Sequence, residues 1–329
     1  MDNLCHTLVG AALAQSGLKR RSALATATLL IGANLPDVDV IAVPLGHSLE
    51  WRRGITHGIP ALVVLPIVLT GVMLAWDRIV RRRPHRGRAP TVAPVRPGQL
   101  LLLAALAVLT HPVLDWMNSY GMRWLMPFDG RWSYGDALYI IDPWLWVMLA
   151  IGVAAARRVP AGRYERARSP SRDRAAAWAL GVAAAYIAVM VGSRYAGVSV
   201  VRRQAERLGI APDAVVAVMP EAVTPFTRQV VVAEGESYHL GTLRWLPAPR
   251  VTFRATLPMN ARDPAAVAAA ATPEARAMLG WSRFPFFIVR STAGAVVVRV
   301  DDARYSSGDD PSWASVTVRL PPEAAQPQP

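Results

Sequence analysis

The stretch GQLLLLAALAVLTHPVLDWM, residues 98–117, is an apolar segment with a histidine and an aspartate near its end. About 20 mainly apolar residues are enough for a helix to cross a bilayer. Three further segments of this kind are Gly58–Ile79, Ala137–Ala156 and Ala175–Tyr195. Two shorter ones, Leu4–Leu18 and Ser22–Leu35, predict a helical hairpin that turns at a basic triplet. We therefore predict a membrane all-α bundle of about five to six helices over residues 1–198.

The composition supports a membrane protein. Of the 329 residues, 53% are hydrophobic and only 18% are charged, whereas soluble domains carry about 25% charged residues. This balance excludes a disordered chain and argues against a wholly soluble one. The single cysteine, Cys5, excludes an internal disulfide framework.

The net charge of +13 comes mainly from arginines that lie in alternate loops. The basic runs are KRR at 19–21, RRRPHRGR at 81–88 and RRVPAGRYERARSPSRDR at 157–174. Short cytoplasmic loops are enriched in Lys and Arg, so we assign these three loops to the cytoplasm. The runs lack the interleaved aromatic residues of a single-strand binding surface, and we expect the lipid bilayer rather than nucleic acid as the partner.

We predict that residues 199–329 form an α+β domain. We expect this domain to be extracytoplasmic, because the last span leaves the cytoplasm. An Ala-rich stretch, Pro264–Leu279, is helical by propensity, and the end of the chain is expected to fray. The strand-like runs are Ala214–Met219, Arg228–Ala233, Tyr238–Trp245, Val251–Thr256, Phe286–Arg290, Ala295–Val300 and Ser315–Leu320.

Seven ionisable residues lie inside or at the ends of the apolar segments, where such groups are costly and usually functional. They are His6, Asp37, Asp39, His57, His111, Asp115 and Asp142. The charge-based topology, which was assigned without them, places all seven toward the extracytoplasmic face. We therefore predict that they form one shared site.

The residue types point to a metal. Imidazole together with carboxylate favours zinc, with manganese or iron as alternatives. Seven candidates exceed the four ligands of one zinc ion, so we expect one or two ions, or further roles for some residues. We expect Asp39 or Asp115 to accept a proton from water. Asp142 also fits a helix cap before Pro143.

Spacing supports the site. His111 and Asp115 are four residues apart and share a helix face. Asp37 and Asp39 follow a proline in NLPDVD, where an irregular turn can aim both carboxylates at one point. Arg52 and Arg53 stand close to His57, and they could bind an anionic group of a substrate or anchor the chain at the membrane surface.

The segments MDNLCHTLVGAAL, NLPDVD, RRGITHG, LTHPVLDWMNSYG and YIIDPWLW resemble the bacterial family of inner-membrane metal-dependent hydrolases, also described as LexA-binding. The resemblance covers the N-terminal half well and reaches more loosely to FPFF and DDARY in the tail. It departs at Cys5, where a threonine or similar residue is expected. The family resemblance implies hydrolysis with a divalent metal and location in the inner membrane, but no substrate.

Three functions follow from these features. The first is a metallohydrolase acting on a phosphoester or lipid-linked substrate at the extracytoplasmic face. The second is a divalent-cation or proton transporter, which usually places its site near the midplane and often uses repeats. The third is a non-enzymatic membrane regulator whose basic loops dock a partner. The clustering at one face and the lack of a repeat favour the hydrolase.

Overall fold

The computed structural model describes residues 1–42, 44, 51–83, 93–158, 170–292, 294–306 and 310–325. The chain divides into two compact units, Met1–Val191 and Gly192–Pro329. The long helix α7 (Pro170–Arg207) contributes to both units, because their division falls within it. A domain boundary at residues 198 and 199 stays a prediction.

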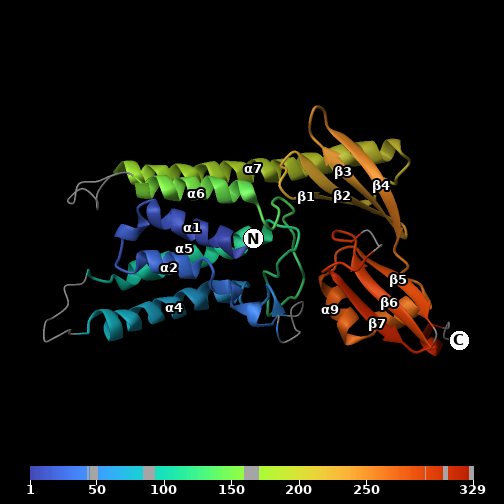
Figure 1. Cartoon of the computed structure of the whole chain (residues 1–329), viewed down its shortest axis with the longest axis horizontal. Helices are drawn as coiled ribbons and strands as arrows, with labels where there is room; N and C mark the ends of the chain where they lie inside the picture. The colour runs from blue at the N-terminus through green and yellow to red at the C-terminus, as the bar shows by residue number, and fades with distance from the viewer. Residues whose placement is uncertain are drawn as a thin grey trace. The chain divides into compact units, whose positions relative to one another are not determined.

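The first unit is a set of helices whose axes run along one direction in Figure 1. They are α1 (Asn3–Gln15), α2 (Ala25–Gly32), α4 (Ile59–Trp76), α5 (Pro97–Trp116), α6 (Pro143–Arg158) and α7, with short helices η1 (Leu18–Arg20), η2 (Leu35–Ala42) and η3 (Asp77–Arg81). Within the described ranges, three segments are long and apolar enough to span a membrane, Ile59–Arg81, Pro97–Trp116 and Asp173–Arg207, and α6 is a shorter apolar helix. The predicted fold class is confirmed.

Small residues allow α1, α2 and α5 to pack closely. A Cβ atom on Gly10 of α1 would lie 2.7 Å from the carbonyl oxygen of Leu29 in α2, and one on Gly32 of α2 would lie 2.9 Å from Ala107 of α5. Such close approach is typical of helices packed in membranes. There, van der Waals packing drives helix association in place of the hydrophobic effect, and small residues allow the backbones to come close. The predicted hairpin is therefore present, and it turns through η1.

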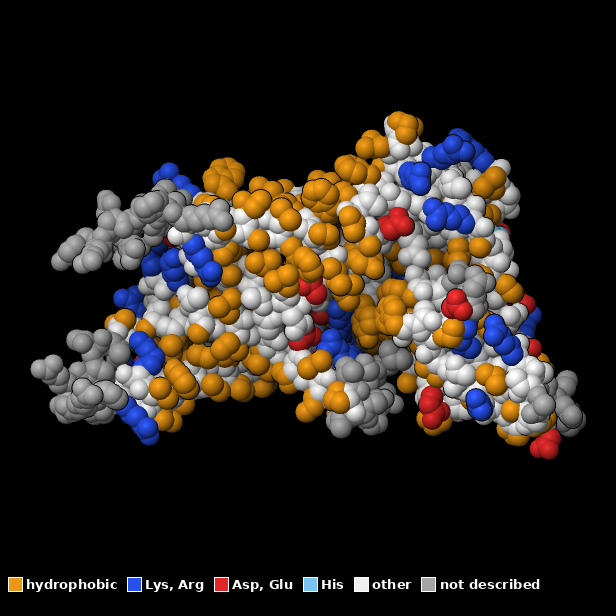
Figure 2. All heavy atoms as spheres, in the orientation of Figure 1, with side chains coloured by type: hydrophobic (Ala, Val, Ile, Leu, Met, Phe, Trp, Pro, Cys, Tyr) orange, Lys and Arg blue, Asp and Glu red, His pale blue; other side chains and the backbone are white. Residues whose placement is uncertain are grey.

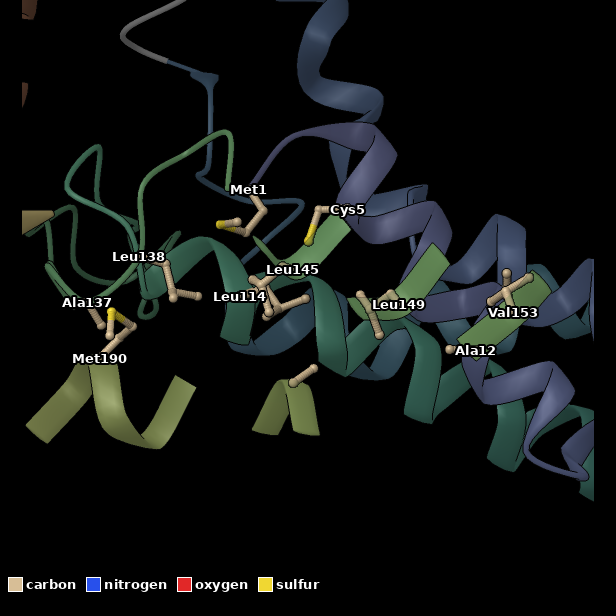
Figure 3. Packing of buried hydrophobic residues seen from close by; sticks show 12 residues of the cluster. Met1, Cys5, Ala12, Leu114, Ala137, Leu138, Leu145, Leu149, Val153 and Met190 are labelled. Carbon is tan, nitrogen blue, oxygen red and sulfur yellow. The ribbon is translucent and has the colours of Figure 1, made fainter. Parts of the chain in front are cut away.

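A second core joins α1 to the later helices (Figure 3). Cys5 of α1 and Leu114 of α5 belong to the same buried cluster as Leu145 and Leu149 of α6 and Met190 of α7. Cys5 is fully buried. It therefore behaves as a small apolar core residue.

The basic ends of the helices meet at one end of the unit, opposite the ends that carry the polar cluster described below. Arg20, in the turn after α1, forms an ion pair with Asp173 at the start of α7. Ser22 accepts a hydrogen bond from the backbone of Arg96, just before α5. Figure 2 shows Lys and Arg side chains gathered at this end, beyond a hydrophobic band. Much of the two longer basic runs lies outside the described residues.

Two helix boundaries differ from the prediction. Helix α6 begins at Pro143 instead of Ala137, because the side chain of Asp142 accepts hydrogen bonds from the backbone N–H groups of Trp144 and Leu145. The predicted helix over 264–279 is two helices, α8 (Pro264–Ala270) and α9 (Pro273–Trp281). Thr272 caps the N-terminus of α9, and this cap divides the alanine-rich run into two helices.

The second unit contains two antiparallel sheets. The first has the order β1-β2-β3-β4 and the second the order β5-β6-β7. All seven predicted strands are present, as β1 (Val215–Pro220), β2 (Thr227–Glu234), β3 (Ser237–Arg244), β4 (Arg250–Pro258), β5 (Pro285–Thr292), β6 (Ala295–Asp302) and β7 (Ser315–Leu320). Gly235 adopts a positive φ of 55° in the tight β2–β3 turn, which glycine allows without steric cost.

A buried ion pair holds the end of β6. The carboxylate of Asp302 accepts hydrogen bonds at 2.9 Å from both Nε and Nη2 of Arg304 and at 2.5 Å from the Ser282 hydroxyl. Burial alone would raise the pKa of Asp302, but the charge of Arg304 and these hydrogen bonds outweigh it and lower the pKa below its usual value. The ionised carboxylate therefore stabilises the folded domain.

We predict that Asp302→Asn lowers the free energy of unfolding of this sheet by about 3 kcal/mol at neutral pH, because it leaves the buried Arg304 without its counter-charge. A depressed pKa gives stability that is present above the unfolded pKa of about 3.9 and is lost as the pH falls through the folded value. Hydrogen exchange of β6 in the full-length protein, corrected for intrinsic exchange, should show the difference between parent and variant shrinking below about pH 4. A difference that persists unchanged at pH 2 would contradict this account.

Candidate metal centre

Three segments bring polar side chains to the end of the helical unit away from its basic loops. Asp37 lies in η2, directly after α2, and His57 lies two residues before α4. His111 and Asp115 occupy the last two turns of α5. The antiparallel course of α4 and α5 therefore places the start of one beside the end of the other.

Four side chains offer ligand atoms that all lie within 4.8 Å of one another. Asp37 Oδ1 is 3.8 Å from His57 Nε2 and 3.7 Å from His111 Nε2. Asp115 Oδ2 is 3.5 Å and 3.6 Å from the same two nitrogens. All four side chains are buried, so the unit encloses two imidazoles between two carboxylates.

The hydrogen bond of His111 Nδ1 determines which ring nitrogen of His111 carries the proton. His111 Nδ1 lies 2.7 Å from the carbonyl oxygen of Ala33, which can only accept a hydrogen bond. Nδ1 therefore carries the proton, and Nε2 presents a lone pair to the cluster. Among the described residues this nitrogen has no hydrogen-bond partner, although buried polar atoms normally have one. A metal ion would satisfy it.

The Nδ1 atom of His57 is held in a similar way, by the carboxylate of Asp39 in place of a backbone carbonyl group. Its Nδ1 lies 3.3 Å from Asp39 Oδ2 and 3.0 Å from the Thr56 hydroxyl oxygen. The Thr56 hydroxyl donates to Asp39 Oδ2 and therefore accepts from Nδ1, which carries the proton. Nε2 then points its lone pair at the cluster, and no described residue forms a hydrogen bond with it. Burial lowers the pKa of His57 to about 4 despite the neighbouring Asp39, so the ring is neutral at neutral pH. Carboxylate–histidine pairs of this kind orient metal ligands.

The nitrogen–oxygen separations in the cluster are close to those around a tetrahedral metal ion. Bonds of 2.0–2.1 Å in a regular tetrahedron separate the ligand atoms by about 3.3–3.4 Å. The four nitrogen–oxygen separations in the cluster, 3.5–3.8 Å, exceed this value only slightly. The two imidazole nitrogens and two carboxylate oxygens all lie within 4.8 Å of one another, so the set could hold a divalent metal.

His6 lies beside these four donors. Its ring stacks on His111 with the centroids 3.7 Å apart, and its Nε2 is 3.3 Å from Asp115 Oδ1. Its Nδ1 is buried and has no hydrogen-bond partner in the described part of the chain. His6 therefore joins the cluster from α1, as a wall of the site.

The two predicted anion-binding arginines occupy different environments. Arg52 is partly exposed, and its guanidinium contacts Asp37 Oδ1 at 3.4 Å and Asp39 Oδ1 at 3.0 Å. Arg53 is buried, and its Nε lies 2.9 Å from Asp115 Oδ2. Its Nη1 donates to Asn118 Oδ1 and to the carbonyl oxygen of Gly121. Arg52 is the more accessible of the two to a bound molecule.

Several residues of the site were missed by the sequence analysis. Asn118 Oδ1 accepts hydrogen bonds from Arg53 and from the backbone of Tyr120, whose ring lies 4.7 Å below the Arg53 guanidinium. Arg123 donates to the backbone oxygen of Arg52. A signal was available for Asn118, which stands three residues after Asp115, but nothing local marked the loop contacts.

Asp142 has a different place from the other six candidates. Besides capping α6, its carboxylate accepts a hydrogen bond from the hydroxyl of Tyr186 in α7, 3.0 Å away. Among the described residues, its hydrogen-bond partners belong to α6 and α7 and not to the cluster. The geometry therefore assigns Asp142 to the helix cap, the alternative that the Asp-Pro sequence had left open.

Comparison with known proteins identifies the family of the helical unit. The sequence profile of the YdjM inner membrane protein family matches residues 1–196, which hold all the helices that carry the cluster. The chain belongs to the YdjM inner membrane protein family. The predicted family of inner-membrane proteins is thereby confirmed.

Relatives of this YdjM family member add little about chemistry. The chain is 24% identical over 127 residues to the uncharacterized protein YfhP of Bacillus subtilis (strain 168). The match covers 38% of this chain and 34% of YfhP, so it spans about a third of that relative. No solved structure matches the chain.

We predict that purified protein of this YdjM family member retains a divalent metal and that His111→Ala loses most of it, because one of four donors is removed. Asp142→Asn, which alters a buried carboxylate outside the cluster, serves as the matched control and should keep the metal. Elemental analysis of both variants against the parent, after removal of loosely bound ions, tests this. Equal metal content in the parent and in His111→Ala would contradict the site.

Proposed function

We propose that the protein is a membrane-bound metal-dependent hydrolase that acts on a phosphoester or lipid-linked substrate at the extracytoplasmic face. The observation that carries the proposal is the buried set of two histidines and two aspartates, in which the imidazole Nε2 atoms have no hydrogen-bond partner among the residues that the structure describes. Buried ionisable groups in a membrane protein are functional by default. Resemblance to the metal-dependent hydrolases adds the reaction class.

The donor set favours zinc, with manganese or iron as alternatives, because two imidazoles and two carboxylates combine borderline and hard ligands. Three of the four donors would hold one ion and leave its fourth position to water. His6 and Asp39 lie beside them and could take part if a second ion binds. A divalent metal held there would activate water and polarise the scissile bond.

The chain's own residues supply orientation and a proton acceptor. The backbone of Ala33 fixes His111, and Asp39 fixes His57. The carboxylate of Asp39 or Asp115 that stays uncoordinated is the proposed proton acceptor. Asp115 takes this role if Asp37, His57 and His111 hold the ion and Asp115 is left uncoordinated beside it, whereas Asp39 lies behind His57.

Arg52 is the proposed contact for an anionic group of the substrate. Its side chain is 20% exposed and already pairs with two carboxylates of the site. A phosphate that reached this point would form charge-assisted hydrogen bonds with the same guanidinium. Arg53, which we expected to share this role, is buried against Asp115 and is better suited to holding that carboxylate in place.

The proposed location follows from the distribution of charge. The arginines that flank η3 and the α1–α2 turn lie at the end of the unit away from the cluster. Cytoplasmic loops carry such residues. The cluster and the C-terminal α+β unit are therefore proposed to face the extracytoplasmic side.

We predict that a reporter active only outside the cytoplasm is active when fused after Leu320 and silent when fused at His85. The physical reason is the excess of arginines in the loop around His85, which retains it in the cytoplasm. Activity of both fusions should be compared at equal expression. The opposite pattern would overturn the extracytoplasmic placement of the site.

For the reaction, we predict that either His111→Ala or Asp37→Ala abolishes metal-dependent hydrolysis of a phosphoester substrate while membrane insertion is unchanged. Groups that act as one unit lose activity non-additively, so the double variant should be little worse than either single one. Purified parent and variants, supplied with divalent metals, are assayed against phospholipids and generic phosphoesters, with Asp142→Asn as the matched control.

A transporter would give different results in the same experiment. Its site variants would lose metal flux into liposomes, and the parent would show no hydrolysis. Metal-dependent flux together with consistent inactivity on every phosphoester would reject the hydrolase.

A further inference from the structure

Large apolar side chains surround the segments that hold the cluster. We call this set the apolar rim; it consists of Val38, Val40, Ile41, Trp51, Ile55 and Phe128. Each is about half exposed or more, and Phe128 is 84% exposed. The backbone N–H of Ile59 donates to the oxygen of Trp124, so the loop that carries Phe128 packs against the start of α4. The rim therefore borders the site from three segments.

The rim residues alternate with the site residues along the chain. In η2, the buried Asp37 and Asp39 are separated by the exposed Val38. Before α4, the buried His57 stands two residues after Ile55, which is 59% exposed. Each segment thus directs its polar side chains into the cluster and its apolar side chains outward.

The rim lies outside the helices that are long and apolar enough to span a membrane, since these begin at Ile59 and end at Trp116 in this region. Its exposure is therefore not explained by the spans themselves. An exposed apolar patch of this kind beside a charged site marks a membrane or ligand surface. Tryptophan and aliphatic side chains at a helix end are typical of the interfacial zone of a bilayer.

The positively charged side chain of Arg52 lies at the inner edge of the rim. Arg52 stands between Trp51 and Arg53, and its guanidinium is 3.0 Å from Asp39 Oδ1. It is partly exposed, whereas the carboxylates and imidazoles behind it are buried. In Figure 2, acidic and basic side chains come together near the middle of the view with hydrophobic side chains around them. An anionic group that crosses the rim would meet Arg52 first.

We propose that the apolar rim is immersed in the bilayer interface and admits an anionic lipid from the membrane, with its phosphate at Arg52 and its chains against the rim. The inference rests on the proposed function and narrows its substrate to membrane-resident phospholipid-like molecules. Hydrocarbon chains on the rim remain in an apolar medium throughout binding, so the phosphate reaches the site without the lipid leaving the bilayer. A water-soluble phosphoester has no such anchoring and binds weakly.

The position of the rim is tested by spin labelling. The natural Cys5 is fully buried, so a nitroxide can be directed to Ile55→Cys, with Val267→Cys on α8 as an exposed apolar control from the other unit. In vesicles of phosphatidylcholine and phosphatidylglycerol, we expect the label at position 55 to be reached by oxygen and protected from a water-soluble nickel chelate. Equal access of the nickel chelate to both positions would overturn the proposal.

Lipid selection is tested by binding. Binding of dioleoyl phosphatidic acid to the detergent-solubilised protein is measured by native mass spectrometry. We expect the lipid to bind, and we expect that glycerol 3-phosphate does not displace it. Arg52→Gln and Ile55→Asn should each weaken binding about tenfold, whereas Arg131→Gln should not. Arg131 is the matched control because it is an exposed arginine paired with Asp129, away from the cluster.

The outcomes separate this inference from the proposed hydrolysis. Binding of phosphatidic acid that depends on Arg52 and Ile55, without turnover, keeps the lipid site and rejects the hydrolase. Hydrolysis of glycerol phosphates at the rate of the lipid, with binding unaffected by the Ile55 change, rejects the lipid site and keeps the hydrolase. The Ile55 variant leaves every charge of the cluster in place, so its effect cannot come from loss of the metal ligands.

Discussion

The contact of Asp115 with His57, His111 and Arg53 is the constraint on which the helical unit depends. A carboxylate in an apolar bundle is costly unless it is paired and hydrogen-bonded. Asp115 meets this condition only because α1, α5 and the segment before α4 come together around it. The loops at this end are therefore shaped by the need to satisfy buried charge.

Close helix packing makes that convergence possible. Gly10 lets α2 lie against α1, and Gly32 lets it lie against α5. The carbonyl oxygen of Ala33, at the end of α2, then reaches His111 Nδ1. A larger side chain at Gly32 would meet Ala107 and push away the backbone group that orients His111. Packing and ligand orientation are thus two consequences of the same small residue.

Sequence reasoning identified most of the candidate site, because intramembrane histidines and aspartates are rare enough to stand out. It placed Asp142 with the others on the basis of depth alone. The depth of a residue in the membrane does not determine the direction in which its side chain points. The Asp142 carboxylate accepts hydrogen bonds from the first turn of α6 and from the Tyr186 hydroxyl. The same limit applies to Arg53, whose neighbour Arg52 remains accessible while Arg53 itself folds inward.

By itself, the sequence determined the apolar helices, the basic ends of their loops, the seven strands and the set of candidate ligands, because hydropathy, charge and periodicity are local properties of the chain. Only the tertiary structure decided which four ligand atoms face one another, which tautomer each histidine adopts and which arginine remains exposed. These features depend on distances between segments up to 78 residues apart, such as His111 Nδ1 and the Ala33 carbonyl oxygen, and no local pattern encodes such distances.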